Sequence, residues 1–398
     1  MDVSQTLAGH PTTIHCIDMH TTGQPTRIIY AGYPKLTGTL LAQRDQAREH
    51  HDHIRQQLML EPRGNPAMYG AIICPETELV RSGEADVGVL FVHNEGYSTM
   101  CGHATLALGR FLIDTHDTSV FPRRPHLAFN ASTQTIQLRL HAPCGVVSVR
   151  VPTNAAGTQS DPSRPVAFLS TPAYATALQL TIPIPAAARW PELPPTKHSI
   201  TLDISYGGAF YAIVPATELG FFAGGLRGGV DLAAITRCMQ QLKPYLERQP
   251  EVVAAVQHPE DPRLSFLYSI MIVDSAVGLP SADVAGAETG LCYFADNQID
   301  RSPTGSCVTA RMALAHAKGK RPVGLRWAYH SLVSNHFGTD EFCAEVVEEV
   351  EGRRPSVIVR VEGRGFYTGT ASFMVEAEDR VSRKGFTMEG VAAAAAAA

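Results

Sequence analysis

Two segments of the 398-residue chain share one pattern: a small reactive residue, a glycine, and then an apolar run with helical spacing. The first copy begins at Cys101 and Gly102, and the second begins 203 residues later at Thr304 and Gly305. In each copy the pattern predicts that a helix begins at the reactive residue. A helix start carries unpaired N–H groups and the positive end of the helix dipole, which attract anions. Because the spacing is about half of the chain, it supports an internal pseudo-repeat.

The two reactive residues differ in the acidity of their side chains. A thiol at a helix start is more easily ionised, so Cys101 is a candidate general base; the alternative is an inert cysteine buried at a helix start. The hydroxyl of Thr304 is far less acidic and cannot exchange protons at neutral pH without an activating partner. Residues 300–303, which precede Thr304, also have a purely structural interpretation, because Asp and Ser cap helices and Pro is common in the first helical turn.

The composition argues against two kinds of partner. The net charge is −5 and no Lys/Arg-rich run occurs, so we expect no nucleic-acid binding. No apolar run is long enough to span a membrane, and residues 1–11 lack the pattern of a secretory signal. The eight cysteines form no C-x-x-C pair, which favours a reduced, cytoplasmic setting with most thiols packed in the core.

Hydrophobic periodicity predicts a mixed α/β chain. The predicted helices are residues 40–60, 231–246 and the runs that begin at Cys101 and Thr304. The predicted strands are residues 13–17, 26–30, 78–80, 86–92, 135–140, 146–151, 199–204, 210–214, 266–273, 356–361 and 372–376.

A Pro- and Ala-rich stretch at 182–196 indicates either a long turn or the approach to a domain boundary. We therefore expect an N-terminal domain over 13–197 that carries Cys101, and a C-terminal domain over 198–365 that carries Asp300 and Thr304. The low-complexity residues 391–398 are expected to form a disordered tail.

The two helix-start motifs resemble the signatures of the proline racemase family. They are Met-Cys-Gly-His-Ala-Thr at 100–105 and Asp-Arg-Ser-Pro-Thr-Gly-Ser at 300–306. Four further stretches agree with the family, namely residues 18–24, 60–64, 93–97 and 206–212. The resemblance runs from about residue 15 to Thr370, nearly the whole chain, and the motifs together are specific.

The resemblance implies a fold similar to diaminopimelate epimerase. Two similar domains would each wrap a curled β-sheet or barrel around a central helix, with the active site in the cleft between them. Cys101 and Thr304 would head the two helices, and residues from about 366 to 390 would return to the N-terminal domain. The resemblance also implies a homodimer.

By the same resemblance, backbone N–H groups at the two helix starts would bind the substrate carboxylate, and Asp300 would pair with the ring ammonium. The residues of the carboxylate site would be Gly102, His103, Gly305 and Ser306. Racemases and epimerases of the family carry cysteine at both helix starts, whereas this chain has Thr304 at the second. In this respect it resembles the family's trans-3-hydroxy-L-proline dehydratases, which implies dehydration to Δ1-pyrroline-2-carboxylate without a metal or cofactor.

Two alternatives stay open at this point. The chain is a proline or 4-hydroxyproline racemase or epimerase if Cys307 or water supplies the second acid, although a packing role for Cys307 is favoured. Alternatively, the chain is a non-catalytic amino-acid-binding protein that has the family's cleft but does not turn over a substrate.

Three other features receive weaker interpretations. The run of His50, His51, Asp52 and His53 suggests metal binding, but a solvated helix face is favoured. The glycine-rich segment 224–229 lacks the Lys-Ser/Thr ending of a phosphate loop, so a mobile loop is expected. Tyr206-Gly207-Gly208 follows a predicted strand and has no assigned role.

Overall fold

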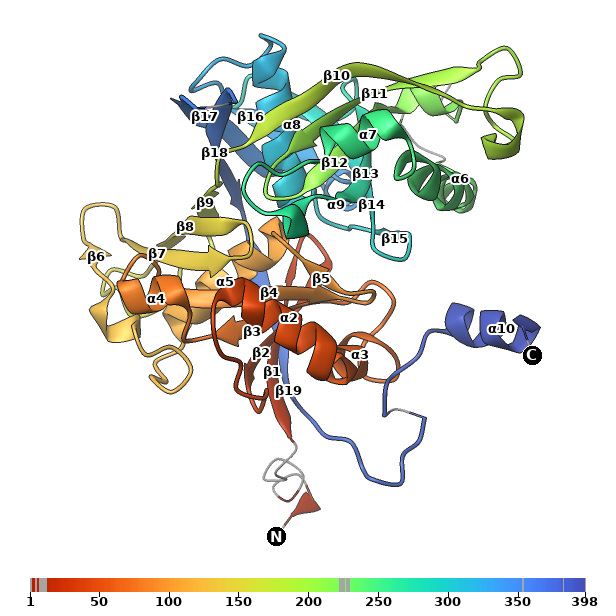
Figure 1. Ribbon diagram of the computed structural model, residues 1–398. Helices are drawn as coiled ribbons and strands as arrows, with labels where there is room; N and C mark the ends of the chain where they lie inside the picture. The colour runs from red at the N-terminus through yellow and green to blue at the C-terminus, as the bar shows by residue number, and fades with distance from the viewer. Residues whose placement is uncertain are drawn as a thin grey trace. The chain divides into compact units, whose positions relative to one another are not determined.

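The computed structural model describes residues 2, 3, 6, 13–221, 226, 230–352, 354–381 and 383–397. The chain forms two compact units: unit 1 contains residues 1–166 and 364–398, and unit 2 contains residues 167–363 (Figure 1). The division lies at residue 166 and not at 197, because β10 (Tyr174–Pro183) pairs antiparallel with β11 (Ser199–Tyr206). Most of the glycine-rich segment 224–229 lies outside the described residues.

Unit 1 is built on one sheet that curls around a helix. Its strands are β1 (Ile14–Thr21), β2 (Gln24–Ala31), β3 (Tyr69–Cys74), β4 (Val87–His93), β5 (Tyr97–Ser98), β6 (Phe129–Asn130), β7 (Thr135–Ala142), β8 (Gly145–Pro152) and β19 (Gly365–Phe373). They pair in the order β19-β1-β2-β3-β4-β7-β8, with β5 added to β4 and β6 to β7. The β2–β3 and β4–β7 pairs are parallel, and the other pairs named are antiparallel.

The central helix of unit 1 is α5 (Gly102–Asp114). It contacts β1, β2 and β3 and also β8 and β19, so strands from both ends of the sheet reach the same helix. Residues 102–113 are all buried, as expected for a helix enclosed by a sheet, and most of them are apolar.

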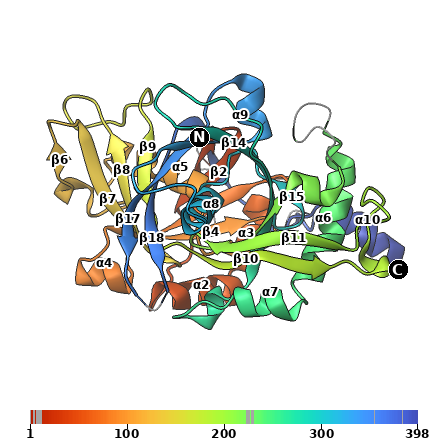
Figure 2. The same ribbon diagram turned by 90° about the horizontal axis from the view of Figure 1, so that it is seen from above.

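Unit 2 repeats this plan. Its strands are β9 (Val166–Leu169) at the boundary, β10, β11, β12 (Phe210–Pro215), β13 (Leu267–Asp274), β14 (Ala287–Phe294), β15 (Gln298–Ile299), β16 (Trp327–His330), β17 (Phe342–Val350) and β18 (Ser356–Gly363). They pair in the order β10-β11-β12-β13-β14-β16-β17-β18-β9, with β15 added to β14. The central helix α8 (Gly305–Ala317) contacts β10, β11, β12, β17 and β18 and is seen end-on among them in Figure 2.

The internal duplication is visible in the pairing. The run β1-β2-β3-β4 pairs antiparallel, parallel, antiparallel, and β11-β12-β13-β14 does the same. In each unit the fourth strand forms a hairpin with a two-residue strand, the central helix follows, and the chain returns parallel to the fourth strand. The predicted fold class, two similar α/β domains with a curled sheet around a central helix, is confirmed.

Three predictions differ from the structure, and each difference is explained by local backbone conformation, helix capping or helix propensity. The predicted helix 40–60 is two helices, α2 (Leu40–His50) and α3 (Asp52–Met59), because His51 leaves the helical conformation with φ −127° and ψ 12°. The predicted strand 78–80 is wrong, since the hydroxyl of Thr77 caps a short helix, α4 (Glu78–Ser82).

The C-terminal residues are also helical. The described part of the predicted disordered tail, residues 391–397, falls in α10 (Met388–Ala397), because alanine has the highest helix propensity of all residues. The remaining helices are α6 (Leu232–Leu246), capped by Asp231 as the predicted helix 231–246 requires, α7 (Pro250–Ala255) and α9 (Leu332–Phe337).

Candidate active site

Half-site 1, formed by Cys101, Gly102 and His103, stands at the N-terminus of α5. The β4–β5 hairpin leads into it, and Cys101 is the N-cap residue with an extended backbone at φ −142° and ψ 111°. Its carbonyl accepts the N–H of Thr105 at 3.0 Å, whereas its side chain caps nothing. The thiol therefore does not cap the helix, and the residue is only 4% exposed.

The imidazole of His103 lies against this thiol. Cys101 Sγ is 3.3 Å from His103 Nδ1 and 3.6 Å from Nε2, so the sulfur lies over the face of the imidazole ring. The ring of Tyr69 on β3 meets the imidazole edge-on, with the ring centroids 4.8 Å apart. Thr21 Oγ1 of β1 donates a hydrogen bond of 3.1 Å to the His103 carbonyl. The resemblance implied a role for the backbone of His103 alone, and the structure adds its side chain.

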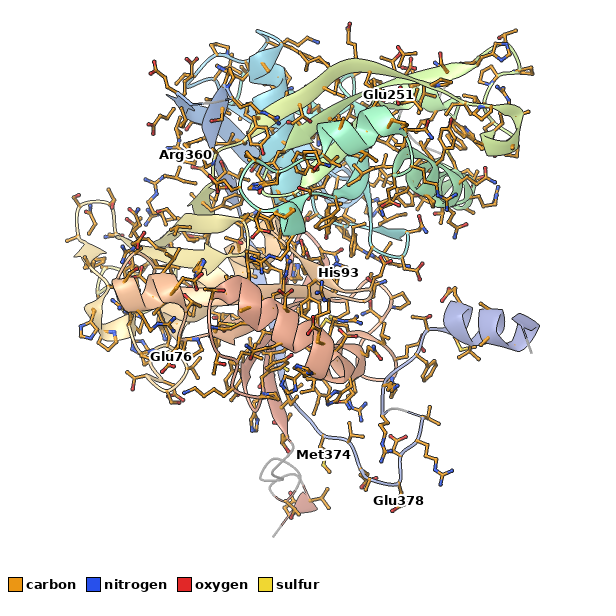
Figure 3. All side chains as sticks on the ribbon, in the orientation of Figure 1. Glu76, His93, Glu251, Arg360, Met374 and Glu378 are labelled. Carbon is orange, nitrogen blue, oxygen red and sulfur yellow. The ribbon has the colours of Figure 1, made fainter. Side chains whose placement is uncertain are left out.

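The segment that leads to Cys101 is held by buried polar groups. Arg55 forms a bidentate ion pair with Asp52, at 2.6 and 2.7 Å, and donates to the carbonyls of His93 and Asn94. His93, labelled in Figure 3 and located at the end of β4, packs against Tyr69 with the ring centroids 5.6 Å apart and the rings tilted by 41°. The backbone N–H groups of residues 95 and 96 donate to its Nδ1. These contacts hold the residues between β4 and α5 before the catalytic candidate is reached.

This arrangement also bears on the histidine cluster at 50–53. Asp52 is engaged by Arg55 and Gln56, and within the described ranges no group of three or more His, Cys, Asp or Glu side chains has metal-binding geometry. A metal site at this cluster is therefore not supported.

Half-site 2, formed by Asp300, Thr304, Gly305 and Ser306, stands at the N-terminus of α8. Thr304 is the N-cap residue, and its carbonyl accepts the N–H of Val308 at 2.7 Å. Its φ of 65° and ψ of 82° are unusual for a β-branched residue and cost about 1–3 kcal/mol. The local hydrogen bonds described next keep the residue in this conformation.

Asp300 organises the loop that precedes α8. Its Oδ2 accepts the hydroxyl of Thr304 at 2.8 Å, and its Oδ1 accepts the N–H of Ser302 at 2.8 Å. Ser302 Oγ in turn accepts the N–H of Thr304 at 3.1 Å. Because the hydroxyl hydrogen of Thr304 points to Asp300, the side chain of Thr304 can offer only its oxygen lone pairs to a ligand.

Ser306 and Gly207 fix the first turn of α8 against the sheet. Ser306 Oγ and the hydroxyl of Tyr211 on β12 share a hydrogen bond of 2.6 Å, and burial raises the pKa of Tyr211 well above its usual value. A Cβ on Gly207 would lie 2.2 Å from the Ser306 carbonyl oxygen and 2.6 Å from the Ala310 nitrogen. The Tyr206-Gly207-Gly208 turn therefore has a structural role: only glycine lets it touch the backbone of α8.

Cys307 faces away from this half-site into the apolar core. It is fully buried in a cluster with Tyr211, Met271 and Leu314, and burial raises the pKa of its thiol well above the ordinary value. Cys292 on β14 is also buried; its thiol lies 3.0 Å from Ser269 Oγ, and burial raises its pKa to about 12. The packing role favoured for Cys307 agrees with its position.

Sequence reasoning missed three residues that shape the half-sites: Thr21, Tyr69 and Tyr211. Thr21 and Tyr211 lie in stretches that carry the family resemblance, so their motifs pointed to them without a role. Tyr69 had no such signal, because only the curl of the sheet brings β3 beside His103.

Comparisons with known proteins identify relatives over almost the whole chain. The model of the family described as proline racemase matches residues 16–387. Trans-3-hydroxy-L-proline dehydratase of Homo sapiens is 39% identical over 376 residues, which are 94% of each chain. Trans-L-3-hydroxyproline dehydratase of Mus musculus is 41% identical over 375 residues, again 94% of each.

Two solved structures share the fold. A probable proline racemase from Agrobacterium radiobacter K84 has a TM-score of 0.75 at 23% identity, covering 94% of this chain and 96% of that one. A hydroxyproline epimerase from Agrobacterium vitis, with bound trans-4-hydroxy-L-proline, has a TM-score of 0.74 at 21% identity and covers 96% of both chains.

Proposed function

Because the chain belongs to the proline racemase family, we propose that it dehydrates trans-3-hydroxy-L-proline to an enamine, which tautomerises to Δ1-pyrroline-2-carboxylate. Relatives that bear the name of this dehydratase are about 39% identical over 94% of the chain. One observation carries the proposal beyond the names. The first helix start presents a thiol, whereas the second presents a hydroxyl whose hydrogen is donated to Asp300.

The substrate binds through its charged groups. Backbone N–H groups at both helix starts, those of Gly102 and His103 on α5 and of Gly305 and Ser306 on α8, hold the carboxylate, as helix N-termini hold anions. Asp300 accepts the ring ammonium through its carboxylate, which has about four acceptor positions.

Cys101 then acts as the base at Cα. Its thiolate takes the Cα proton, and the electron pair of that bond remains as a carbanion stabilised by the bound carboxylate. The carbanion forms a C2–C3 double bond as the C3–O bond breaks and its electron pair leaves with the oxygen. In the trans-3 isomer the Cα proton and the hydroxyl lie on the same ring face. The thiol can therefore return its proton to the departing oxygen, which gives water and restores the thiolate.

Racemisation is the less favoured reaction because it needs an acid on the opposite face. Thr304 donates its hydrogen to Asp300, and Cys307 is fully buried in the core of unit 2. Neither group is a poised second acid. A carbanion that no second acid protonates either takes its proton back from Cys101, with retention of configuration, or expels the C3 oxygen.

Three further parts of the proposal concern the setting of the enzyme. The reaction uses no cofactor, the protein acts in the cytoplasm, and it forms a homodimer. All eight cysteines are free, which fits a reducing compartment. No helix among the described residues is both long and apolar enough to cross a membrane. Light scattering of the purified protein tests the dimer.

A panel of proline derivatives tests the activity. The purified protein should form a cyclic ketimine from trans-3-hydroxy-L-proline, and it should leave the optical rotation of L-proline and trans-4-hydroxy-L-proline unchanged. Loss of optical rotation with the latter two substrates would favour a racemase or epimerase. Binding without any conversion would favour an amino-acid-binding protein.

A further inference from the structure

Arg55 on α3 is a buried arginine that the proposed reaction does not use. Its Nε and Nη2 form a bidentate ion pair with Asp52, at 2.6 and 2.7 Å. Its Nη1 donates to the carbonyls of His93 and Asn94 at 2.9 and 2.6 Å. Arg55 is only 4% exposed, so water competes little with these charge-assisted bonds. We call Arg55, Asp52 and the two carbonyls the α3 clamp.

The two carbonyls belong to a bend and not to a regular strand. Successive carbonyl groups of an extended strand point to opposite sides, so one nitrogen can reach both only where the chain turns. The turn lies at the end of β4, where the N–H groups of residues 95 and 96 also donate to His93 Nδ1. Those bonds close the bend locally, whereas Arg55 fixes its position relative to α3.

The bend lies on the path of the chain to the proposed base. Only residues 95–100 separate Asn94 from Cys101, and β5 within them pairs back on β4. The first turn of α5 is anchored separately, because Thr21 Oγ1 donates to the His103 carbonyl. A change at the bend therefore acts on the Cys101 sulfur more than on the helix start proposed to bind the carboxylate.

We propose that Arg55 is a positioning residue, which acts through the bend at His93 and Asn94 and sets the position of the Cys101 sulfur relative to the bound substrate. This inference rests on the proposed function, because it concerns the base of that reaction. Arg55 itself exchanges no proton with the substrate. Misplacing reacting groups by about 1 Å can cost about 10²-fold in rate, so loss of the α3 clamp should appear in kcat.

Arg55→Lys tests the proposal. Lysine keeps a positive charge for Asp52 but lacks the planar fork that reaches both carbonyls. The kcat for trans-3-hydroxy-L-proline should fall about 10–100-fold. The dissociation constant of the substrate, measured by calorimetry on the Cys101→Ser background, should stay within about threefold, since the clamp does not bind the substrate. A purely structural role would lower the amount of folded protein and would not separate kcat from binding.

Arg124→Lys is the matched control within unit 1. Arg124 is also buried and donates to two carbonyls, those of Ile113 at 2.9 Å and Gly157 at 3.3 Å. Ile113 lies at the C-terminal end of α5, far along the helix from Cys101. The kcat of this variant should therefore stay close to that of the wild type.

Hydrogen exchange tests the α3 clamp without turnover. In Arg55→Lys the backbone N–H groups of residues 94–100 should exchange at least about tenfold faster than in the wild type, whereas those of α5 should not change. Asp52→Asn gives a second variant if Arg55→Lys does not fold. It keeps the arginine, removes the carboxylate that orients the guanidinium, and should show the same pattern with a smaller loss of kcat.

The positioning role is overturned if Arg55→Lys keeps the kcat of the wild type, if Arg124→Lys loses as much, or if the dissociation constant rises as far as kcat falls. The two proposals fail separately. A wild-type protein that does not convert trans-3-hydroxy-L-proline rejects the proposed function, and unchanged exchange of residues 94–100 in Arg55→Lys then still rejects the clamp. Equal conversion by wild type and Arg55→Lys rejects the positioning role alone.

Discussion

Thr304 Oγ1 donates its hydrogen to Asp300 Oδ2 across 2.8 Å at the start of α8. The equivalent position at the start of α5 holds Cys101, whose sulfur contacts an imidazole. Each of the two units thus has the N-terminus of its central helix headed by a different reactive side chain. Only one of them can exchange a proton near neutral pH.

Replacing the hydroxyl at the second helix start should create the missing acid. Thr304→Cys places a thiol at each helix start and should introduce measurable conversion of L-proline to Cα-deuterated D-proline in D2O, with some loss of dehydration. Positioned acid catalysis is worth roughly 10²–10⁴-fold in rate, enough to compete with elimination. Thr304→Ser is the matched control, because it keeps a hydroxyl for Asp300 and should show no exchange. If wild type itself racemises L-proline readily, the assignment of Thr304 fails.

Cys101→Ser should abolish turnover while the fold is kept, since a hydroxyl cannot replace the thiolate as base. We expect a loss of at least about 10²-fold in kcat, with an unchanged circular dichroism spectrum. Cys343→Ser, at a half-buried thiol on β17, is the control and should keep full activity. A Cys101→Ser protein that retains a tenth of the wild-type rate would show that another group is the base.

Asp300→Asn should weaken substrate binding, because it removes the charge proposed to face the ring ammonium. Truncating one partner of a buried charge pair typically costs about 2–5 kcal/mol. Calorimetry on the inactive Cys101→Ser background measures the dissociation constant without turnover. An unchanged constant would remove Asp300 from the substrate site and leave it as the organiser of the loop at 300–304.

Gly207→Ala should destabilise the protein by pushing α8 away from the sheet. The added methyl would lie 2.2 Å from the Ser306 carbonyl oxygen, and forced overpacking of this kind costs about 1–3 kcal/mol. Gly352→Ala is the control within the same unit, since its Cβ would meet nothing within 4 Å. Urea unfolding compares the two variants, and equal stabilities would contradict the close approach.

The buried ion cluster of unit 2 predicts a pH dependence of stability. Burial alone would raise the pKa of Glu288, but the charges of Arg311 and Arg321 outweigh it and hold the pKa below its usual value. The ionised form is therefore stabilised by folding, and this contribution is present above the unfolded-state pKa and is lost as the pH falls through the folded-state value. Glu288→Gln should cost about 3–5 kcal/mol at neutral pH and less in acid, measured by denaturant unfolding.

How far the sequence predicts this molecule depends on whether a feature is local. Helix starts at Cys101, Thr304 and Asp231 follow from capping and periodicity, and the structure has helices there. Strands β3, β10, β14 and β17 were not predicted. Of these, β3 and β14 are buried almost throughout, and such strands need not alternate polar and apolar residues.

The side-chain contacts of the half-sites depend on non-local packing. The sequence motifs pointed to Cys101, His103, Asp300 and Thr304, but the imidazole–thiol contact follows from backbone angles and from Tyr69 on a distant strand. The bond from Thr304 to Asp300 likewise needs the positive φ of Thr304, which no local propensity favours.

One measurement tests the central claim, elimination by a single thiol, most directly. The wild-type protein is incubated with trans-3-hydroxy-L-proline in D2O, and nuclear magnetic resonance follows the product and the unreacted substrate together. The account predicts that Δ1-pyrroline-2-carboxylate accumulates while the remaining substrate keeps its Cα configuration. Accumulation of the Cα-inverted, deuterated epimer in place of the ketimine would contradict it.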